Sequence, residues 1–200
     1  DTKNNSKIVF GDLTANFDWS KALDGIDIVV HLAARVHLIK DNSLDPLADF
    51  RVVNTNATLN LANQATLAGV SRFIFISSIK VNGETSDFGK PITPNSPTLL
   101  DFYKSEIAPN SHLLDPYGLS KNEAELGLKS LAANSSMDVV IIRPPLVYGP
   151  GVKGNLERLL NYLDKRALLP IGQINNKRSL VSLENLNSLI LECIINERAA

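Results

Sequence analysis

The sequence is poor in the residues that build disulfide frameworks and metal sites. It has one cysteine, Cys193, which lies in a helical pattern where a buried, reduced thiol is expected. It has three histidines, His31, His37 and His112, and none of them has the paired ligand spacing of a zinc site. We therefore expect no metal and no disulfide scaffold, and we expect His31 to be a packed histidine within a strand.

The sequence also lacks an excess of one charge and a long apolar run. Its 20 basic residues are balanced by 21 acidic ones, so nothing in its electrostatics favours nucleic acid or a membrane surface as a partner. No stretch approaches the roughly 18 apolar residues of a membrane span, and no charged-then-apolar leader opens the chain. We expect a cytoplasmic protein with a small-molecule ligand.

Short β-rich runs alternate with longer helical patterns along the chain. Four runs are nearly continuous in apolar residues and rich in β-branched ones, which is typical of parallel strands covered on both faces. These runs are 7–10, 26–34, 72–77 and 138–143. Strands that alternate with helices in this way predict an α/β fold, a Rossmann-like doubly wound parallel sheet.

Two long helices are expected between these strands. Apolar residues recur at helical spacing over 47–68, and Asp115 and Pro116 supply a cap and a first-turn proline for a helix over 116–133. The intervening segment 82–114 is rich in Pro, Asn, Ser and Thr, which predicts a long functional loop.

Beyond residue 150 the pattern is helical again. We expect a helix at about 155–166, a short extended segment over 178–183 and a last helix at about 184–196.

Tyr117 and Lys121 lie four positions apart at the start of the second long helix, and the third strand leads into Ser77 and Ser78. Open α/β sheets bind ligands at the carboxyl ends of their strands, so these side chains are expected to share a cleft. The ammonium of Lys121, one helical turn away, is expected to lower the pKa of Tyr117 by about 1–3 units, and Ser78 to hold a substrate oxygen. An ordinary helix surface is the alternative, but the position after a Ser-Ser strand end favours acid–base catalysis.

Six segments carry a resemblance to a known family. They are GDL (11–13), DIVVHLAA (27–34), NTNAT (54–58), FIFISSIKVNG (73–83), DPYGLSK (115–121) and IIRPPLVYGPG (141–151). Their order resembles the extended short-chain dehydrogenase/reductase family, which includes epimerases, dehydratases and reductases of nucleotide sugars. The resemblance implies that Ser78, Tyr117 and Lys121 are catalytic, with Tyr117 moving a proton while NAD or NADP takes or gives a hydride.

The resemblance also implies contacts for the cofactor and for a UDP-sugar substrate. The expected cofactor positions are Asp12, Leu13, Leu32, Ala33, Ala34, Asn54, Tyr117, Lys121 and Pro144. The expected substrate positions are Ser78, Lys80, Asn155 and Arg178. Structural alternatives remain open, since Asp12 and Asn155 could be caps, the two alanines could serve close packing, and Arg178 could be a surface residue.

In this family a first βαβ unit carries the glycine-rich turn for the dinucleotide pyrophosphate, and this sequence has no such unit. We expect either that residues precede Asp1 or that the chain alone binds the cofactor weakly. Residues 1–150 are expected to form a partial dinucleotide-binding domain with the catalytic residues, and 151–200 the start of a substrate-binding lobe. The resemblance further implies a homodimer through helices 47–68 and 116–133.

Departures from the family pattern narrow the expected activity. The 4,6-dehydratases have an acidic pair where this chain has Ile79 and Lys80, which argues against dehydration. Asn82 replaces a common tyrosine, Leu146 replaces an asparagine of several epimerases, and 99–112 looks inserted. The segment SSIKVNGE resembles UDP-4-keto-6-deoxy-N-acetylhexosamine reductases and related 4-epimerases.

The expected activity is therefore at C4 of a UDP-sugar, as a 4-epimerase or a 4-keto reductase. The alternatives are reduction of a non-sugar carbonyl, such as that of a steroid or flavonoid, and dinucleotide sensing without turnover.

Overall fold

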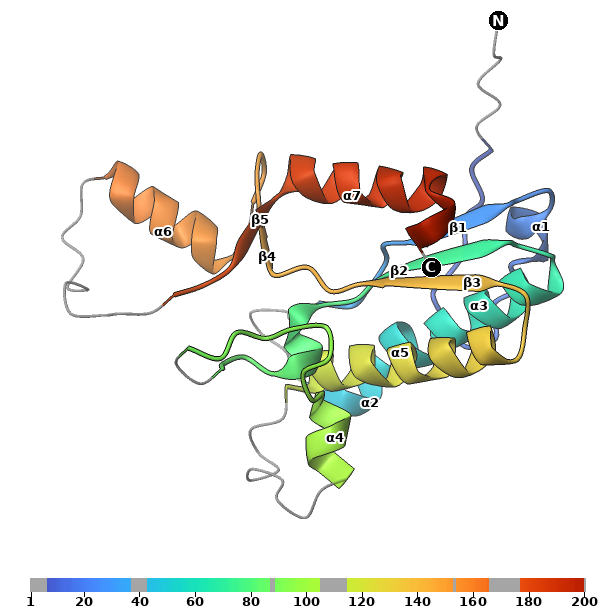
Figure 1. Cartoon of the computed structure of the whole chain (residues 1–200), viewed down its shortest axis with the longest axis horizontal. Coiled ribbons are helices and arrows are strands. Elements are labelled where there is room, and N and C mark those ends of the chain that lie inside the picture. The colour runs from blue at the N-terminus through green and yellow to red at the C-terminus, as the bar shows by residue number, and fades with distance from the viewer. Residues whose placement is uncertain are drawn as a thin grey trace, which may run out of the picture.

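The computed structural model describes residues 7–36, 43–86, 89–104, 115–152, 154–165 and 177–199. Its centre is a parallel sheet with helices on both faces (Figure 1). The strands are β1 (Ile28–His31), β2 (Arg72–Ile76) and β3 (Asp138–Ile142), which lie in the order β1-β2-β3. Three of the four predicted strands, and the predicted Rossmann-like α/β architecture, are confirmed.

The strand predicted over 7–10 is wrong. These residues form no strand, and the side chains of Ile8 and Phe10 are 78% and 90% exposed. A strand needs a neighbouring strand to complete its backbone hydrogen bonds. Within the described part of the chain β1 pairs only with β2, so no strand lies beside 7–10.

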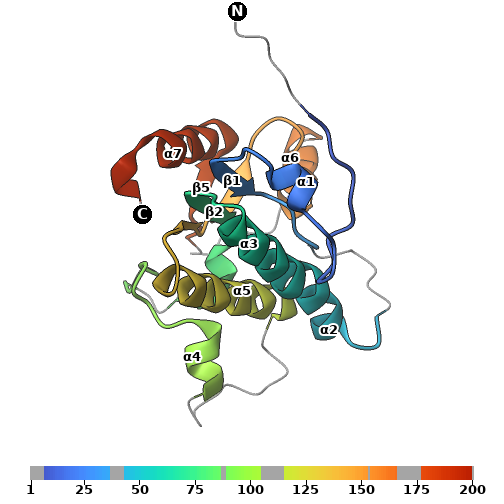
Figure 2. The same cartoon turned by 90° about the vertical axis from the view of Figure 1, so that its right-hand side faces the viewer.

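Two long helical segments cover one face of the sheet (Figure 2). The first is continuous and consists of α2 (Pro46–Phe50), the π-helix η1 (Arg51–Ala57) and α3 (Thr58–Leu67), and the second is α5 (Pro116–Ala133). Both agree with their predictions, and Asp115 caps α5 by accepting a hydrogen bond from the Gly118 N–H at 3.1 Å. Phe73 and Phe75 pack on this face against small and branched helix residues, among them Ala65, Ala124 and Leu128.

Helix α7 (Leu183–Ile195) covers the opposite face. Successive side chains of a strand point to opposite faces, so Ile74 packs against Leu186 and Cys193 of α7. Cys193 is a buried free thiol, as expected. The guanidinium of Arg72 donates to the carbonyls of Cys193 and Asn196 at 2.9 and 2.7 Å, which satisfies backbone groups at the end of α7.

The remaining elements surround this core. They are α1 (Ser20–Leu23), the 3₁₀ turns η2 (Ile79–Asn82) and η4 (Glu197–Ala199), α4 (Leu99–Lys104), β4 (Leu146–Tyr148), α6 (Asn155–Asp164) and β5 (Leu180–Ser182). Strands β4 and β5 form a separate parallel pair, and β5, α6 and α7 agree with the predicted elements after residue 150. None of the helices described here combines the length and apolar character needed to cross a bilayer.

Helix α4 lies inside the segment predicted to be a loop. Its Leu99 is buried, and the Leu100 N–H donates to the Asn122 side chain of α5 at 3.0 Å. A tertiary contact of this kind is not visible in local composition. Residues 105–112, the rest of the apparent insertion, lie outside the described residues.

Candidate active site

Ser78 and Tyr117 meet where β2 ends and α5 begins. Ser78 follows β2, and its hydroxyl accepts a hydrogen bond from the Lys80 N–H at 3.2 Å, which caps the turn η2. The same hydroxyl lies near the phenol of Tyr117 and lowers the pKa of that phenol. The Tyr117 ring packs edge-on against Phe50, with 6.0 Å between ring centroids. The predicted serine and tyrosine therefore form one polar pair next to the Phe50 ring.

Lys121 lies one helical turn beyond Tyr117 and is 1% exposed. Its ammonium donates to the Ile76 carbonyl at 2.9 Å and lies 4.4 Å from the centroid of the Phe75 ring. Burial lowers the pKa of Lys121 to about 8, although the nearby Glu125 opposes this shift. The third predicted catalytic residue is thus held at the end of β2.

The predicted effect of Lys121 on Tyr117 is wrong for this structure. Burial raises the pKa of Tyr117 above its ordinary value, and the Asp115 carboxylate raises it further. Lys80 is the cation that pulls this pKa back down. The physical reason is that Lys121 directs its ammonium to the Ile76 carbonyl and the Phe75 ring.

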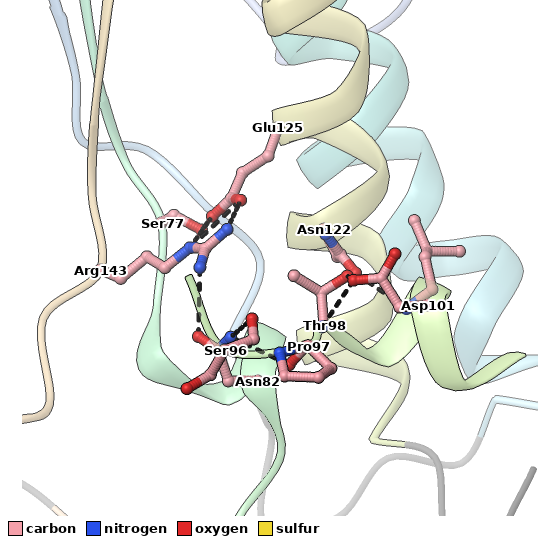
Figure 3. A network of polar contacts seen from close by, with 10 residues as sticks. Ser77, Asn82, Ser96, Pro97, Thr98, Asp101, Asn122, Glu125 and Arg143 are labelled. Atoms are coloured by element: carbon pink, nitrogen blue, oxygen red, sulfur yellow. Dashed lines mark hydrogen bonds and ion pairs between the residues drawn. The ribbon is translucent and has the colours of Figure 1, made fainter. Parts of the chain in front are cut away.

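Glu125 of α5 and Arg143, which follows β3, form a buried ion pair (Figure 3). The Arg143 Nε–H donates to Glu125 Oε1 at 2.9 Å, and the Ser77 hydroxyl donates to the same oxygen at 2.6 Å. The contacts join the ends of β2 and β3 to α5, one turn after Lys121. A buried ionic network whose members are all hydrogen-bonded rigidifies its surroundings. Glu125 and Arg143 were not among the predicted site residues.

Asn82 extends this network towards α4 (Figure 3). Its side-chain carbonyl accepts from Arg143 Nη1 at 3.2 Å, and its amide donates to the carbonyls of Ser96 and Pro97 at 3.0 and 3.1 Å. The departure from the family's tyrosine at this position therefore has a structural role. The carboxamide connects the segment before α4 to the strand ends.

The π-helix η1 brings two neighbouring side chains to α5. Asn54 donates to the Ser120 hydroxyl at 3.1 Å, and Thr55 donates to the Ser120 carbonyl at 2.9 Å. Asn54 also accepts from the Arg35 N–H at 2.8 Å and donates to the Arg35 carbonyl at 3.1 Å. It thereby braces the backbone directly after Ala34. π-helical turns are frequent at functional sites.

The other predicted cofactor positions are not drawn into this network. Leu32 and Ala33 are exposed and Ala34 is half-buried at the end of β1. The Pro144 carbonyl accepts from the Ile79 N–H at 3.1 Å, so it lies beside the turn that follows Ser78. Asp12 is exposed and Leu13 is half-buried in irregular chain.

The predicted substrate positions are dispersed. Lys80 pairs with Glu84 at 2.9 Å and with Asp115 at 3.2 Å. Arg178 is exposed just before β5, and within the described ranges no hydrogen bond or ion pair links it to Ser78 or Tyr117. Asn155 begins α6, but its side chain lies outside the described part of the structure.

His31 is a packed strand histidine, as predicted. Its Nε2 shares a hydrogen bond with the Thr58 hydroxyl at 2.9 Å, and its ring stacks on Phe75. Burial, followed by the charge of Lys121, lowers the pKa of His31 to about 4. His37 and His112 lie outside the described residues. Among the residues that are described, no cluster of His, Cys, Asp and Glu could hold a metal ion.

Known proteins share the sequence and the fold of this chain. A UDP-glucose 4-epimerase of Vibrio cholerae is 50% identical over 191 residues, which are 95% of this chain and 54% of that protein. The structure of MoeE5 in complex with UDP-glucuronic acid and NAD matches with a TM-score of 0.71 and 25% identity, covering 96% of this chain and 60% of that one. For a Bacillus cereus UDP-glucuronic acid 4-epimerase in complex with NAD, the TM-score is 0.73 at 24% identity, covering 94% and 56% of the two chains, which shows the fold alone.

The chain thus spans little more than half the length of these relatives. The pattern that defines the NAD dependent epimerase/dehydratase family matches residues 1–198, almost the whole of this chain. Together with the 50% identity to a UDP-glucose 4-epimerase, this match shows that the chain belongs to the NAD dependent epimerase/dehydratase family.

Proposed function

We propose that the protein is an NAD-dependent enzyme that acts at C4 of a UDP-sugar, and that this chain supplies its catalytic set. The single observation that carries the proposal is that Ser78 and Tyr117 lie together at the end of a central strand, where the Ser78 hydroxyl lowers the pKa of the phenol. The V. cholerae 4-epimerase and the UDP-sugar and NAD named for MoeE5 support this choice of substrate and cofactor.

The residues present fit the nicotinamide end of the cofactor. The ammonium of Lys121 has three N–H donors, and in the described chain its hydrogen-bonding acceptor is the Ile76 carbonyl. Two donors therefore remain for hydroxyls of the nicotinamide ribose. The exposed backbone after β1, braced by Asn54, and Pro144 would line the same ligand.

Tyr117 carries the proton in the proposed reaction. Because its pKa is raised, the phenol is protonated at neutral pH and can donate to a C4 ketone. In the opposite direction its phenolate form accepts the proton of a C4 hydroxyl, and Ser78 holds the same substrate oxygen by a hydrogen bond. NAD, when bound, supplies the hydride transfer at C4. Both 4-epimerisation and 4-keto reduction use these steps.

Replacing Tyr117 with Phe tests this proposal. The variant lacks the proton donor, so kcat is expected to fall by about 100- to 10,000-fold, while the Kd for NAD stays close to that of the wild type. Tyr162→Phe is the matched control, because Tyr162 is exposed on α6, and we expect it to leave kcat unchanged. Turnover that persists in Tyr117→Phe would remove this residue from the mechanism.

A 4-epimerase is the first choice because of the 50% identity to the V. cholerae protein. The segment SSIKVNGE keeps a 4-keto reductase as the second candidate. Absorbance of the reduced cofactor separates them. A reductase consumes NADH in proportion to a UDP-4-keto sugar, whereas an epimerase interconverts gluco and galacto sugars with no net consumption.

A further inference from the structure

Lys80 is fixed between the catalytic serine and the first turn of α5. Its N–H donates to the Ser78 hydroxyl, and its ammonium pairs with the carboxylates of Glu84 and Asp115. Its carbonyl lies so close to α5 that a Cβ atom on Gly118 would approach it to 2.6 Å. Only glycine allows this approach, so the backbone of η2 and the first turn of α5 form one rigid contact beside Tyr117.

Asp115 has a stabilising role that conflicts with the proposed chemistry. As the N-cap of α5 it accepts a hydrogen bond from the Gly118 N–H, an arrangement that stabilises a helix. Its carboxylate is mostly buried and lies two positions before Tyr117 in the sequence. A negative charge at this place disfavours the phenolate and raises the pKa of Tyr117. The cap alone would therefore make the phenol reluctant to give up its proton.

The Lys80 ammonium is the cation that opposes this charge. It lies 3.2 Å from Asp115 and lowers the pKa of Tyr117. Burial disfavours the charge of Lys80, but Glu84 and Asp115 outweigh this effect and raise the pKa of Lys80. The ammonium is therefore permanently charged over the working pH range.

The other charged groups described near the phenol have partners of their own. Lys121, on the same helix, donates to the Ile76 carbonyl. Arg35 lies over the Phe50 ring, 5.6 Å from its centroid, and pairs with Asp49 of α2. From η2 and the two residues after it, the charged groups are Lys80 and its partner Glu84. Among the described residues, Lys80 and Asp115 are thus the charged side chains that shift the pKa of Tyr117.

We propose that Lys80 is a positioning residue which neutralises the Asp115 carboxylate beside Tyr117, so that the phenol can both release and regain its proton during turnover. This inference rests on the proposed function, because the charge near Tyr117 matters for turnover only if Tyr117 carries the proton. It also gives Lys80 a role different from the direct sugar contact that the sequence predicted, since two carboxylates of this chain hold its ammonium.

Three single variants and one double variant test the pair. Lys80→Met removes the cation, Lys80→Arg keeps it, and Asp115→Asn removes the anion while an amide oxygen can still cap α5. The ultraviolet absorbance of tyrosinate reports the ionisation of tyrosine side chains. The chain has 4 tyrosines, so subtracting the titration curve of Tyr117→Phe isolates the contribution of Tyr117. The pH profile of kcat/KM is measured on the same proteins.

The expected shifts have opposite signs. Lys80→Met leaves Asp115 unopposed, so the Tyr117 midpoint should rise by about one pH unit. Asp115→Asn should lower the midpoint by about the same amount, and the double variant should fall between the two single ones. Lys80→Arg should stay close to the wild type. Arg51→Met, which breaks an ion pair with Glu123 elsewhere on α5, is the matched control and should leave the midpoint unchanged.

A purely structural role for Lys80 would lower the melting temperature without moving either the tyrosinate midpoint or the pH profile, and that result would overturn the proposal. If Lys80→Met fails to fold, the downward shift in Asp115→Asn still decides the matter, and an unchanged or higher midpoint there would also overturn it. The ionisation curve needs no turnover. Failure of the proposed function, seen as activity in Tyr117→Phe, is therefore distinguishable from failure of the charge pair.

Discussion

The start of α5 and helix α6 differ in how far this chain completes their environment. Along α5, Ser120, Lys121, Asn122 and Glu125 are all buried polar residues, and each has a hydrogen-bonding partner in the described structure. Along α6, the described side chains are exposed except for Leu156, which is half-buried. Figure 1 places α6 beyond β4 and β5, away from the three-stranded sheet.

This contrast shows where the polar side chains of the proposed site already have fixed partners. Polar groups buried without partners cost free energy, so a helix can bury four of them only if the surrounding strands and turns satisfy each one. The ends of β2 and β3 do this for Lys121 and Glu125, and η1 and α4 do it for Ser120 and Asn122. The proposed catalytic groups gain fixed positions as a result. Exposed leucines on α6 contribute little to folding within the described residues. The part of the proposed site that would transfer the proton is thus the part that this chain specifies more completely.

The largest expected effect comes from breaking the buried network. Glu125→Ala leaves the mostly buried guanidinium of Arg143 without its carboxylate, and the free energy of unfolding should fall by about 3–5 kcal/mol. Denaturant unfolding of the purified protein measures this change. Joint replacement by Glu125→Leu and Arg143→Met should recover much of the loss, because a lone buried charge costs more than an absent pair.

Glu123→Ala is the matched control for this prediction. Glu123 lies two positions before Glu125 on the same helix, and its pair with Arg51 is partly exposed. Surface ion pairs contribute about 0–1 kcal/mol. Equal losses for Glu123→Ala and Glu125→Ala would show that the buried network has no special weight in this fold.

The sequence was sufficient to predict α5 and the positions of two proposed catalytic residues on it. Asp115 and Pro116 mark the start of the helix locally, and the spacing of Tyr117 and Lys121 follows from the helical repeat. The direction of the Lys121 ammonium could not be read in this way. It depends on the Ile76 carbonyl, which belongs to a strand 45 positions earlier in the sequence.

The features that the sequence did not predict also depend on contacts between segments that are distant in the sequence. Residues 7–10 have the composition of a strand, but pairing is a property of two segments, and their composition does not reveal a partner. Glu125 and Arg143 are 18 positions apart and meet only because α5 returns along the sheet to β3. The sequence signals that could have indicated this pair were an acidic residue one helical turn after Lys121 and an arginine at the end of a strand. Helix α4 depends in the same way on Asn122, which lies in another element.

An effect of intermediate size on pH-dependent stability is expected from His31, which is buried at the end of β1. Its pKa is about 4 in the folded protein and about 6.5 when unfolded. The unfolded chain therefore binds a proton first as the pH falls. The stability that comes from a neutral His31 is present above pH 6.5 and is lost between 6.5 and 4, by about 2 kcal/mol at pH 5.

This prediction is checked by urea unfolding of the wild type and of His31→Gln at pH 7 and at pH 5. The wild type should lose about 2 kcal/mol more than the variant between these values. Parallel pH dependence in the two proteins would mean that the histidine is accessible to protons in the folded state.

The smallest effect on the free energy of unfolding is expected from a substitution on α6. Leu160 is 48% exposed, so Leu160→Ala should change the free energy of unfolding by less than about 0.5 kcal/mol. Leu128→Ala, the same substitution at a fully buried position of α5, should cost about 2–5 kcal/mol. A large loss in Leu160→Ala, measured by denaturant unfolding, would show that α6 packs as tightly as α5 in solution, and the contrast between the two helices would then no longer hold.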